Sequence, residues 1–180
     1  IPRERTTEKR DAGEVGSGVL TGDVTTVPAD VASLPDTYVI RLGLTRQKML
    51  EAMQAAQAKL LDTLWNARAP ESVLKSKEEA VTLASIVEKE TGIPEERPLV
   101  ASVFLNRLKQ GIRLQSDPTI IYGLVGGKGK LDRALTKDDV ASDTPFNTYK
   151  IAGPPPGPLA NHGTASLEVL LHPPDTGSLY

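Results

Sequence analysis

The feature that most constrains the fold is a helix with apolar residues on nearly every side. A helix is predicted over about residues 76–91, because Gly92 ends the segment and Pro94 follows as a terminator. Within it, "LASIVEKETG" (residues 83–92) has no broad polar face, so most of its surface must be covered by other elements. We therefore expect a buried helix with two glutamates, Glu88 and Glu90, near its carboxyl end.

The other elements are predicted from apolar periodicity and capping residues. Apolar residues at every third or fourth position predict an amphipathic helix over about 45–67, with Thr45 as its N-cap. Further elements are expected as follows: helices over 98–111, 117–124, 135–141 and from about 164 to before 173, an extended segment over 145–151, a proline- and glycine-rich loop over 153–163, and a short strand or hairpin within 18–27. The expected fold class is α+β, mainly helical with a small extended or β portion.

Composition and charge exclude several classes of function. The chain has no cysteine, which excludes disulfides, thiolate metal sites and a cysteine nucleophile. Its net charge is −2 and its basic residues are scattered, so we expect no nucleic-acid partner. No apolar run approaches the roughly 18 to 20 residues that cross a bilayer. His162 and His172 lack a third ligand at helical spacing, so we assign no metal.

Helical geometry separates the two glutamates of the buried helix. At about 100° per residue, Glu90 lies within about 60° of Leu83, together with Ile86 and Val87, whereas Glu88 lies roughly 140° away. A carboxyl group among apolar side chains and near the carboxyl end of a helix is harder to ionise, so its pKa is expected to be raised. This environment suits a general acid. The alternative is that both glutamates are solvated or paired surface residues.

Two polar clusters outside this helix are candidates for ligand binding. Gln115, Ser116 and Asp117 precede Pro118 at the start of a predicted helix, where an aspartate N-cap followed by proline is about as good an explanation as a binding role. In "PFNTYK", Asn147 and Tyr149 are expected on one side of an extended segment, with Thr148 on the other. Amide and phenol groups suit sugar recognition, although a solvent-exposed strand would explain them as well.

Several of these motifs occur together and in a fixed order. The stretches "LPDTY", "LASIVEKETGIPEERPLVASVFLNRLKQGIRLQSDPTIIYGL" and "TPFNTYKIAGPPPGPLAN" resemble the endolytic murein transglycosylases of the YceG-like (MltG) family, over roughly residues 33–180. The resemblance implies a lysozyme-like catalytic domain over 33–180 that stops before the family's usual terminal strand segment. Residues 1–32 are then a linker or the remnant of a preceding LysM-like module.

The resemblance also implies an activity and a set of site residues. The catalytic residue would be Glu90, the second glutamate of "EKE", and Gln115, Asp117, Asn147 and Tyr149 would bind substrate or orient Glu90. The implied reaction cleaves the β-1,4 bond between N-acetylmuramic acid and N-acetylglucosamine inside peptidoglycan strands. It leaves 1,6-anhydro-muramyl ends, terminates glycan elongation and uses no cofactor. One carboxyl group suffices, because the muramyl C6 hydroxyl attacks the anomeric carbon in place of water.

The same resemblance implies partners and a location. Peptidoglycan glycan strands are the expected substrate, and peptidoglycan synthases are expected as further partners. The family is held at the periplasmic face of the bacterial inner membrane by an N-terminal anchor, so this chain is expected to be a soluble fragment without that anchor. Asn106 and Arg107 also lie in a family motif, with hydrogen bonding within the core or between helices as their expected role.

Two alternatives stay open at this point. A hydrolytic muramidase would release reducing ends, but it needs a second catalytic carboxylate that the sequence does not make obvious. A non-catalytic peptidoglycan-binding or scaffolding module would bind glycan strands and leave them intact.

Overall fold

A computed structural model of the chain describes residues 6–9, 15–18, 20–26, 32–127, 129–174 and 176–179. Its elements are, in chain order, β1 (Thr6–Lys9), β2 (Val15–Gly18), α1 (Arg46–Asn66), α2 (Lys77–Glu90), the short 3-10 helix η1 (Pro94–Glu96), α3 (Arg97–Lys109), α4 (Asp117–Val125), α5 (Lys137–Val140) and α6 (Thr164–Leu171). The described chain is mainly helical. Its β-structure is one antiparallel pair, in which Thr6 of β1 lies opposite Gly18 of β2, plus an isolated bridge.

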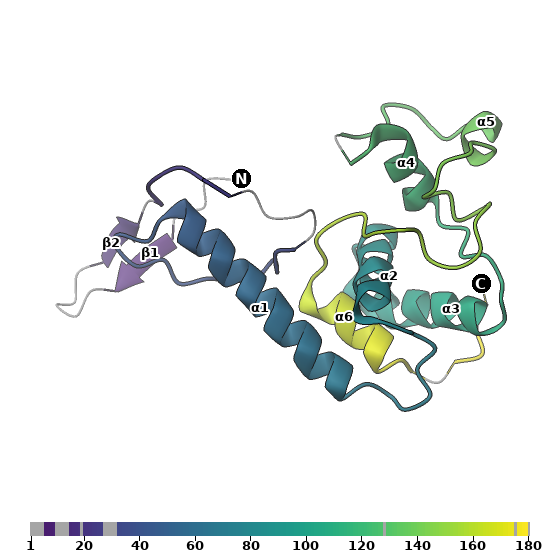
Figure 1. The fold of residues 1–180 in the computed structure, drawn as a ribbon, viewed down its shortest axis with the longest axis horizontal. Helices are drawn as coiled ribbons and strands as arrows, with labels where there is room; N and C mark the ends of the chain where they lie inside the picture. Colours follow the sequence, from purple (N-terminus) through teal and green to yellow (C-terminus); the bar gives the residue numbers. More distant parts are fainter. Residues whose placement is uncertain are drawn as a thin grey trace.

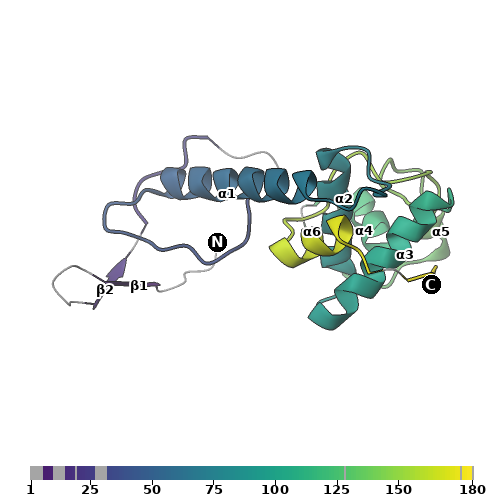
Figure 2. The ribbon, with the colours of Figure 1, turned by 90° about the horizontal axis from the view of Figure 1, so that it is seen from below.

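Helix α2 is the centre of the core. Its side chains from Thr82 to Val87 are all buried, and so is Ala80, two residues earlier. The helices α3, α4 and α6 all pack against α2, and both views of the ribbon show α3 and α6 beside it (Figures 1 and 2). Fully burying a large aliphatic side chain contributes roughly 1.5–3 kcal/mol. The burial of these side chains confirms the prediction of a buried helix in this region.

Helix α1 projects from this core toward the β1–β2 pair (Figures 1 and 2). Thr45 is its N-cap, as predicted, and accepts a hydrogen bond from the backbone N–H of Lys48. Its carboxyl half packs four large apolar side chains against the core: Leu60, Leu61, Leu64 and Trp65. Gln57 is the buried residue of α1, and its side-chain nitrogen lies 3.0 Å from Nε2 of the buried His162. A polar contact therefore joins α1 to the loop before α6.

The loop over 153–163 is tied to α2 as well as to α1. The backbone N–H of Leu159 donates to Oγ of Ser85 at 2.8 Å, and that of Gly163 donates to Glu88 at 3.2 Å. Both acceptors belong to α2. The proline-rich segment thus has no regular secondary structure, as predicted, yet it is fixed on the core at several points.

The helices predicted from the sequence are confirmed to within a few residues, but the segment over 145–151 is not extended. It forms consecutive turns, in which the backbone N–H groups of Lys150 and Ile151 both donate to the carbonyl of Asn147. The side chain of Asn147 explains this. Its amide nitrogen donates to the carbonyls of Val140 and Ser142, and its oxygen accepts from a backbone N–H two residues on, which is how asparagine supports tight turns.

The β-structure also differs from the prediction. The expected strand or hairpin within 18–27 overlaps β2 only at Gly18, because the two strands pair earlier in the chain. Residues 20–26 contribute one isolated parallel bridge, between Thr21 and Thr45, and residues 19 and 27 lie outside the described part. Within the described residues, no helix combines the length and apolar character that crossing a bilayer requires.

Removal of the Gln57 side chain is expected to destabilise the fold. Burial lowers the pKa of His162, so its ring stays neutral, and Gln57→Ala leaves a ring nitrogen without its partner. An unsatisfied buried polar group costs about 1–3 kcal/mol. Urea unfolding followed by circular dichroism should show this loss in the free energy of unfolding. Gln54→Ala in the same helix serves as the control and should change it by less than about 0.5 kcal/mol. Equal effects of the two substitutions would contradict the account.

Candidate active site

Glu90 is the last residue of α2 and lies at the boundary between the core and solvent. The residue is exposed, and its Oε2 accepts a hydrogen bond of 2.9 Å from Oγ of Ser116. Partial burial of the carboxyl group raises its pKa, and the charge of Asp117 acts in the same direction, whereas the Ser116 hydrogen bond and the charge of Arg107 oppose the shift. A carboxyl group that a ligand can reach, and that keeps its proton to a higher pH than usual, can act as a general acid.

Glu88, only two residues earlier, has a different environment. Its Oε2 accepts hydrogen bonds from Oγ of Ser166 at 2.5 Å and from the N–H of Gly163 at 3.2 Å, and its Oε1 lies 3.5 Å from the guanidinium of Arg97. Burial alone would raise the pKa of Glu88, but the two hydrogen bonds and the positive charge outweigh it, so the pKa is lowered. Glu88 is an ionised link between α2, α6 and the preceding loop.

The structure confirms the predicted direction of the Glu90 pKa and corrects the predicted burial. The helical wheel places Glu90 on the apolar face, and burial of its carboxyl group is the first cause of the raised pKa, but the residue as a whole is exposed. Glu88 is half-buried, with 28% of its side chain accessible. The reason is that α2 ends at Glu90, so no further turn covers it, whereas α6 and its preceding loop pack over Glu88.

Asp117 and Tyr149 form a hydrogen-bonded pair beside Glu90. The Tyr149 hydroxyl donates to Oδ1 of Asp117 at 2.7 Å. Partial burial, followed by the hydrogen bond and charge of Asp117 and the charge of Glu90, raises the pKa of Tyr149 to about 12. The phenol therefore stays protonated near neutral pH. Asp117 is the first residue of α4, and its predicted role as N-cap is wrong, because Ser116 occupies the N-cap position.

Gln115 precedes this pair in an unusual backbone conformation. It is exposed, with a φ of 53°, in the left-handed region that residues other than glycine rarely adopt. Its backbone N–H donates to the carbonyl of Thr148 at 3.2 Å, which helps to hold this conformation. Such conformations are concentrated at functional sites.

Asn147 is buried and is not one of the accessible residues around Glu90. Its side chain is fully buried, donates to the carbonyls of Val140, the last residue of α5, and of Ser142, and accepts from the N–H of Tyr149. Of the predicted site residues, Glu90, Asp117 and Tyr149 thus come together, Gln115 is adjacent to Asp117, and Asn147 supports Tyr149 from below.

Sequence reasoning missed a small network of hydroxyl groups behind Glu90. The N–H of Ser116 donates to Oγ1 of Thr148 at 3.0 Å, and Oγ1 of Thr119 lies 2.8 Å from that same oxygen. All three residues are buried. The sequence places Ser116 in the same polar cluster as Gln115 and Asp117 but gives no sign of its bond to Glu90, and it predicts Thr148 on the side opposite Asn147 and Tyr149.

Hydrogen bonds of Asn106 and Arg107 join α3 to segments outside the helices, and these bonds do not reach another helix. The Asn106 amide donates to the carbonyls of Thr176 and Ser178, and the Arg107 guanidinium donates to the carbonyls of Leu114 and Leu179. Arg107 also places a positive charge near Glu90.

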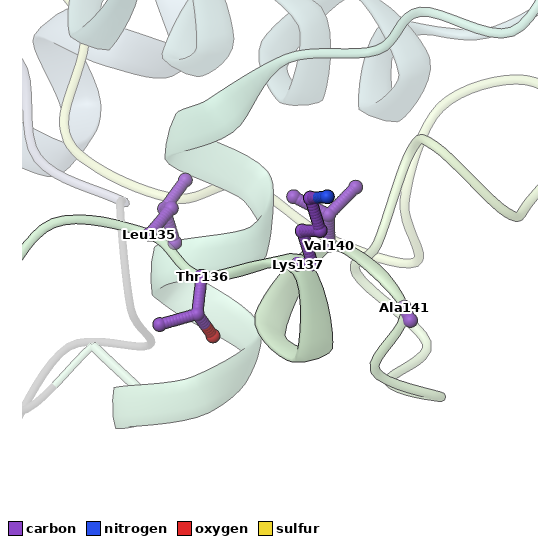
Figure 3. A pocket seen from close by; sticks show the side chains of 5 residues that line it. All are labelled: Leu135, Thr136, Lys137, Val140 and Ala141. Carbon is purple, nitrogen blue, oxygen red and sulfur yellow. The ribbon is translucent and has the colours of Figure 1, made fainter.

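Two hollows on the surface lie away from this cluster. The larger, of about 450 Å³, adjoins α5 and is lined by Leu135, Thr136, Lys137, Val140 and Ala141 (Figure 3). The other, of about 240 Å³, lies between the start of α2, the end of α3 and the loop over 152–154. Glu90, Asp117 and Tyr149 line neither hollow, so the candidate site rests on the polar cluster itself.

Comparison with known proteins decides the family. The model of the YceG-like family matches residues 14–180. The chain belongs to the YceG-like family. This YceG-like chain is 49% identical over 100 residues to an endolytic murein transglycosylase of Bacillus subtilis, a match that covers 56% of the chain and 27% of that relative. It is 36% identical over 155 residues to an endolytic murein transglycosylase of Streptococcus pneumoniae, covering 81% of the chain and 26% of that relative.

A solved structure agrees with this assignment. The YceG-like protein of Listeria monocytogenes is 35% identical, with a TM-score of 0.65 over 83% of this chain and 48% of the other. The YceG-like chain spans about a quarter of the length of the curated relatives from Bacillus subtilis and Streptococcus pneumoniae.

Isosteric substitutions of the two glutamates are expected to change stability in opposite directions. Because the pKa of Glu88 is lowered in the fold, its ionised form stabilises the fold above the unfolded pKa of about 4.5. Glu88→Gln should therefore lower the free energy of unfolding by about 1–2 kcal/mol near pH 7. The raised pKa of Glu90 means that its ionisation destabilises the fold as pH rises past its unfolded pKa, so Glu90→Gln should melt above the parent at pH 7.

Thermal melts over about pH 3.5–8 check both expectations. Below about pH 4 both carboxyl groups become protonated in the unfolded chain, so the difference in melting temperature between each variant and the parent should become smaller. If Glu90→Gln melted below the parent at neutral pH, the environment assigned to Glu90 would be contradicted.

Proposed function

We propose that this chain is a lysozyme-like catalytic domain that cleaves peptidoglycan glycan strands as a lytic transglycosylase, with Glu90 as its general acid and base. One observation carries the proposal: Glu90 ends a buried helix with an accessible carboxyl group whose pKa is raised. The names of the relatives from Bacillus subtilis and Streptococcus pneumoniae support the substrate class.

In the proposed reaction, Glu90 acts twice. Protonated Glu90 donates to the oxygen between N-acetylmuramic acid and N-acetylglucosamine, and the bond from that oxygen to the muramyl C1 breaks. The muramyl C6 hydroxyl then attacks C1, forms the 1,6-anhydro bond and returns its proton to Glu90. The attacking hydroxyl belongs to the same sugar, so its effective concentration is high and no second carboxylate has to activate water.

The neighbouring polar groups suit sugar binding. The exposed carboxylate of Asp117 can accept hydrogen bonds from sugar hydroxyls, and Tyr149 offers an aromatic surface while its own hydroxyl orients Asp117. Gln115 presents an exposed amide next to them. Asn147, which is fully buried, contributes by fixing the turn that carries Tyr149.

The partners and location belong to the same proposal. Glycan strands are the proposed substrate, and peptidoglycan synthases are proposed as partners at the periplasmic face of the inner membrane. Cleavage there would terminate glycan elongation by leaving 1,6-anhydro-muramyl ends.

Mass spectrometry of purified glycan strands tests the reaction. Incubation with the parent chain should yield fragments with 1,6-anhydro ends, and Glu90→Gln should form them about 100- to 10,000-fold more slowly, because it cannot transfer a proton. Glu88→Gln serves as the isosteric control. Assayed below its melting temperature, it should retain most of the activity, since Glu88 is bonded to Ser166 and Gly163 on the side of α6.

Other products would assign another function. Reducing ends would identify a hydrolase, in which Asp117 is the candidate second carboxylate because its charge acts on Glu90. Intact strands that nevertheless co-sediment with the chain would identify a non-catalytic binding module.

A further inference from the structure

The hydroxyl of Ser116 does not cap the helix that it precedes. Thr45, Ser76 and Thr136 each occupy an N-cap position and accept a hydrogen bond from a backbone N–H in the first turn of their helix. Ser116 occupies the same position before α4 with an extended backbone, yet its side chain makes no capping bond. It donates instead to Oε2 of Glu90, at 2.9 Å.

Hydrogen bonds with two threonines hold the backbone of Ser116, so that its hydroxyl stays oriented toward Glu90. The residue is 1% exposed, its N–H donates to Oγ1 of Thr148 at 3.0 Å, and its carbonyl accepts from Oγ1 of Thr119 at 2.6 Å. Since the Thr119 hydroxyl donates to that carbonyl, the Thr148 hydroxyl must supply the proton of the 2.8 Å contact between the two threonines. The network thus has one consistent set of donors, and the Ser116 proton is directed to Glu90.

We propose that Ser116 is a positioning residue, whose hydroxyl occupies Oε2 of Glu90 and leaves Oε1 as the oxygen that gives and receives the proton. This inference rests on the proposed function, since it names the atom through which that reaction runs. A protonated carboxyl group has one hydroxyl oxygen and one carbonyl oxygen. Because Ser116 donates to Oε2, it favours Oε2 as the carbonyl oxygen and so places the proton on Oε1.

The same hydrogen bond makes Glu90 a better acid. It stabilises the carboxylate that forms when the proton leaves, and so opposes the rise in pKa that burial causes. The charged groups that act on Glu90 from neighbouring elements are Asp117 on α4, which raises the pKa, and Arg107 on α3, which lowers it; Tyr149 also interacts with Glu90 from the following loop. Removal of the Ser116 hydroxyl leaves burial and Asp117 opposed by Arg107 alone.

Nuclear magnetic resonance of the Glu90 carboxyl carbon tests this without reference to activity. In chain labelled with ¹³C-glutamate, the Glu90 signal is assigned by its loss in Glu90→Gln, and its titration is compared between the parent and Ser116→Ala. The pKa should rise by about half to one unit in Ser116→Ala. Because Ser116 caps nothing, α4 should retain its stability in this variant. An unchanged or lowered pKa in folded Ser116→Ala would overturn the inference, whatever the reaction proves to be.

Ser166→Ala is the matched control. Ser166 is also a buried serine that donates to a glutamate of α2, but its partner is Glu88. This variant should melt at a lower temperature and leave the titration of Glu90 unchanged. Ser116→Thr keeps the hydroxyl and should return the pKa toward the parent value. Equal shifts of the Glu90 pKa in Ser116→Ala and Ser166→Ala would indicate a general loosening of the site and would overturn the assignment to Ser116.

Kinetics supply the second readout where the parent is active. In Ser116→Ala the basic limb of the pH profile of kcat should move up with the pKa of Glu90, and kcat below that limb should fall about 3- to 10-fold with KM little changed. A larger KM with an unchanged pH profile would instead assign Ser116 to substrate binding and overturn the positioning role.

Discussion

The burial of α2 along six consecutive residues, Thr82 to Val87, is the constraint on which the rest of the structure depends. A helix with no solvated side needs neighbours on every face, and α3, α4 and α6 provide them, while α1 joins the core through α6. At Glu90 the helix reaches solvent, so its last side chain lies close to the core on one side and to water on the other.

This position at the end of α2 gives neighbouring glutamates opposite properties. Glu88 lies under α6 and its preceding loop, where two hydrogen bonds and Arg97 keep it ionised. Glu90 has one hydrogen bond, a nearby acid and partial burial, and these keep it protonated to a higher pH. One carboxyl group therefore stabilises the packing and the other is available for chemistry. This division follows from where the helix stops and from what covers each side chain.

The sequence predicted the helices well, because apolar periodicity and capping residues are local signals. It also proposes Glu90 as the acid, partly through the helical wheel and partly through the family resemblance. The sequence did not predict the exposure of Glu90, because a helical wheel gives only the angle of each residue. It contains no information on where the helix ends or where the elements packed against it end. The turns over 145–151 were missed for a related reason: they depend on buried contacts of the Asn147 amide with carbonyls five and seven residues away. Ser116 stands beside Gln115 and Asp117 in a polar cluster of the sequence, but only the fold shows that its hydroxyl donates to Glu90.

The most direct test of the central claim is a crystal structure of the Glu90→Gln variant with a bound glycan fragment that contains an uncleaved N-acetylmuramic acid to N-acetylglucosamine bond. The quantity to measure is the distance from the substituted side-chain amide to the glycosidic oxygen. Our account predicts hydrogen-bonding distance, about 3 Å, from the atom that replaces Oε1 of Glu90, with the Ser116 hydroxyl still bonded to the other. A glycan bound with its glycosidic oxygen beyond the reach of that amide, or bound instead in the hollow beside α5, would contradict the assignment of Glu90 as the catalytic acid.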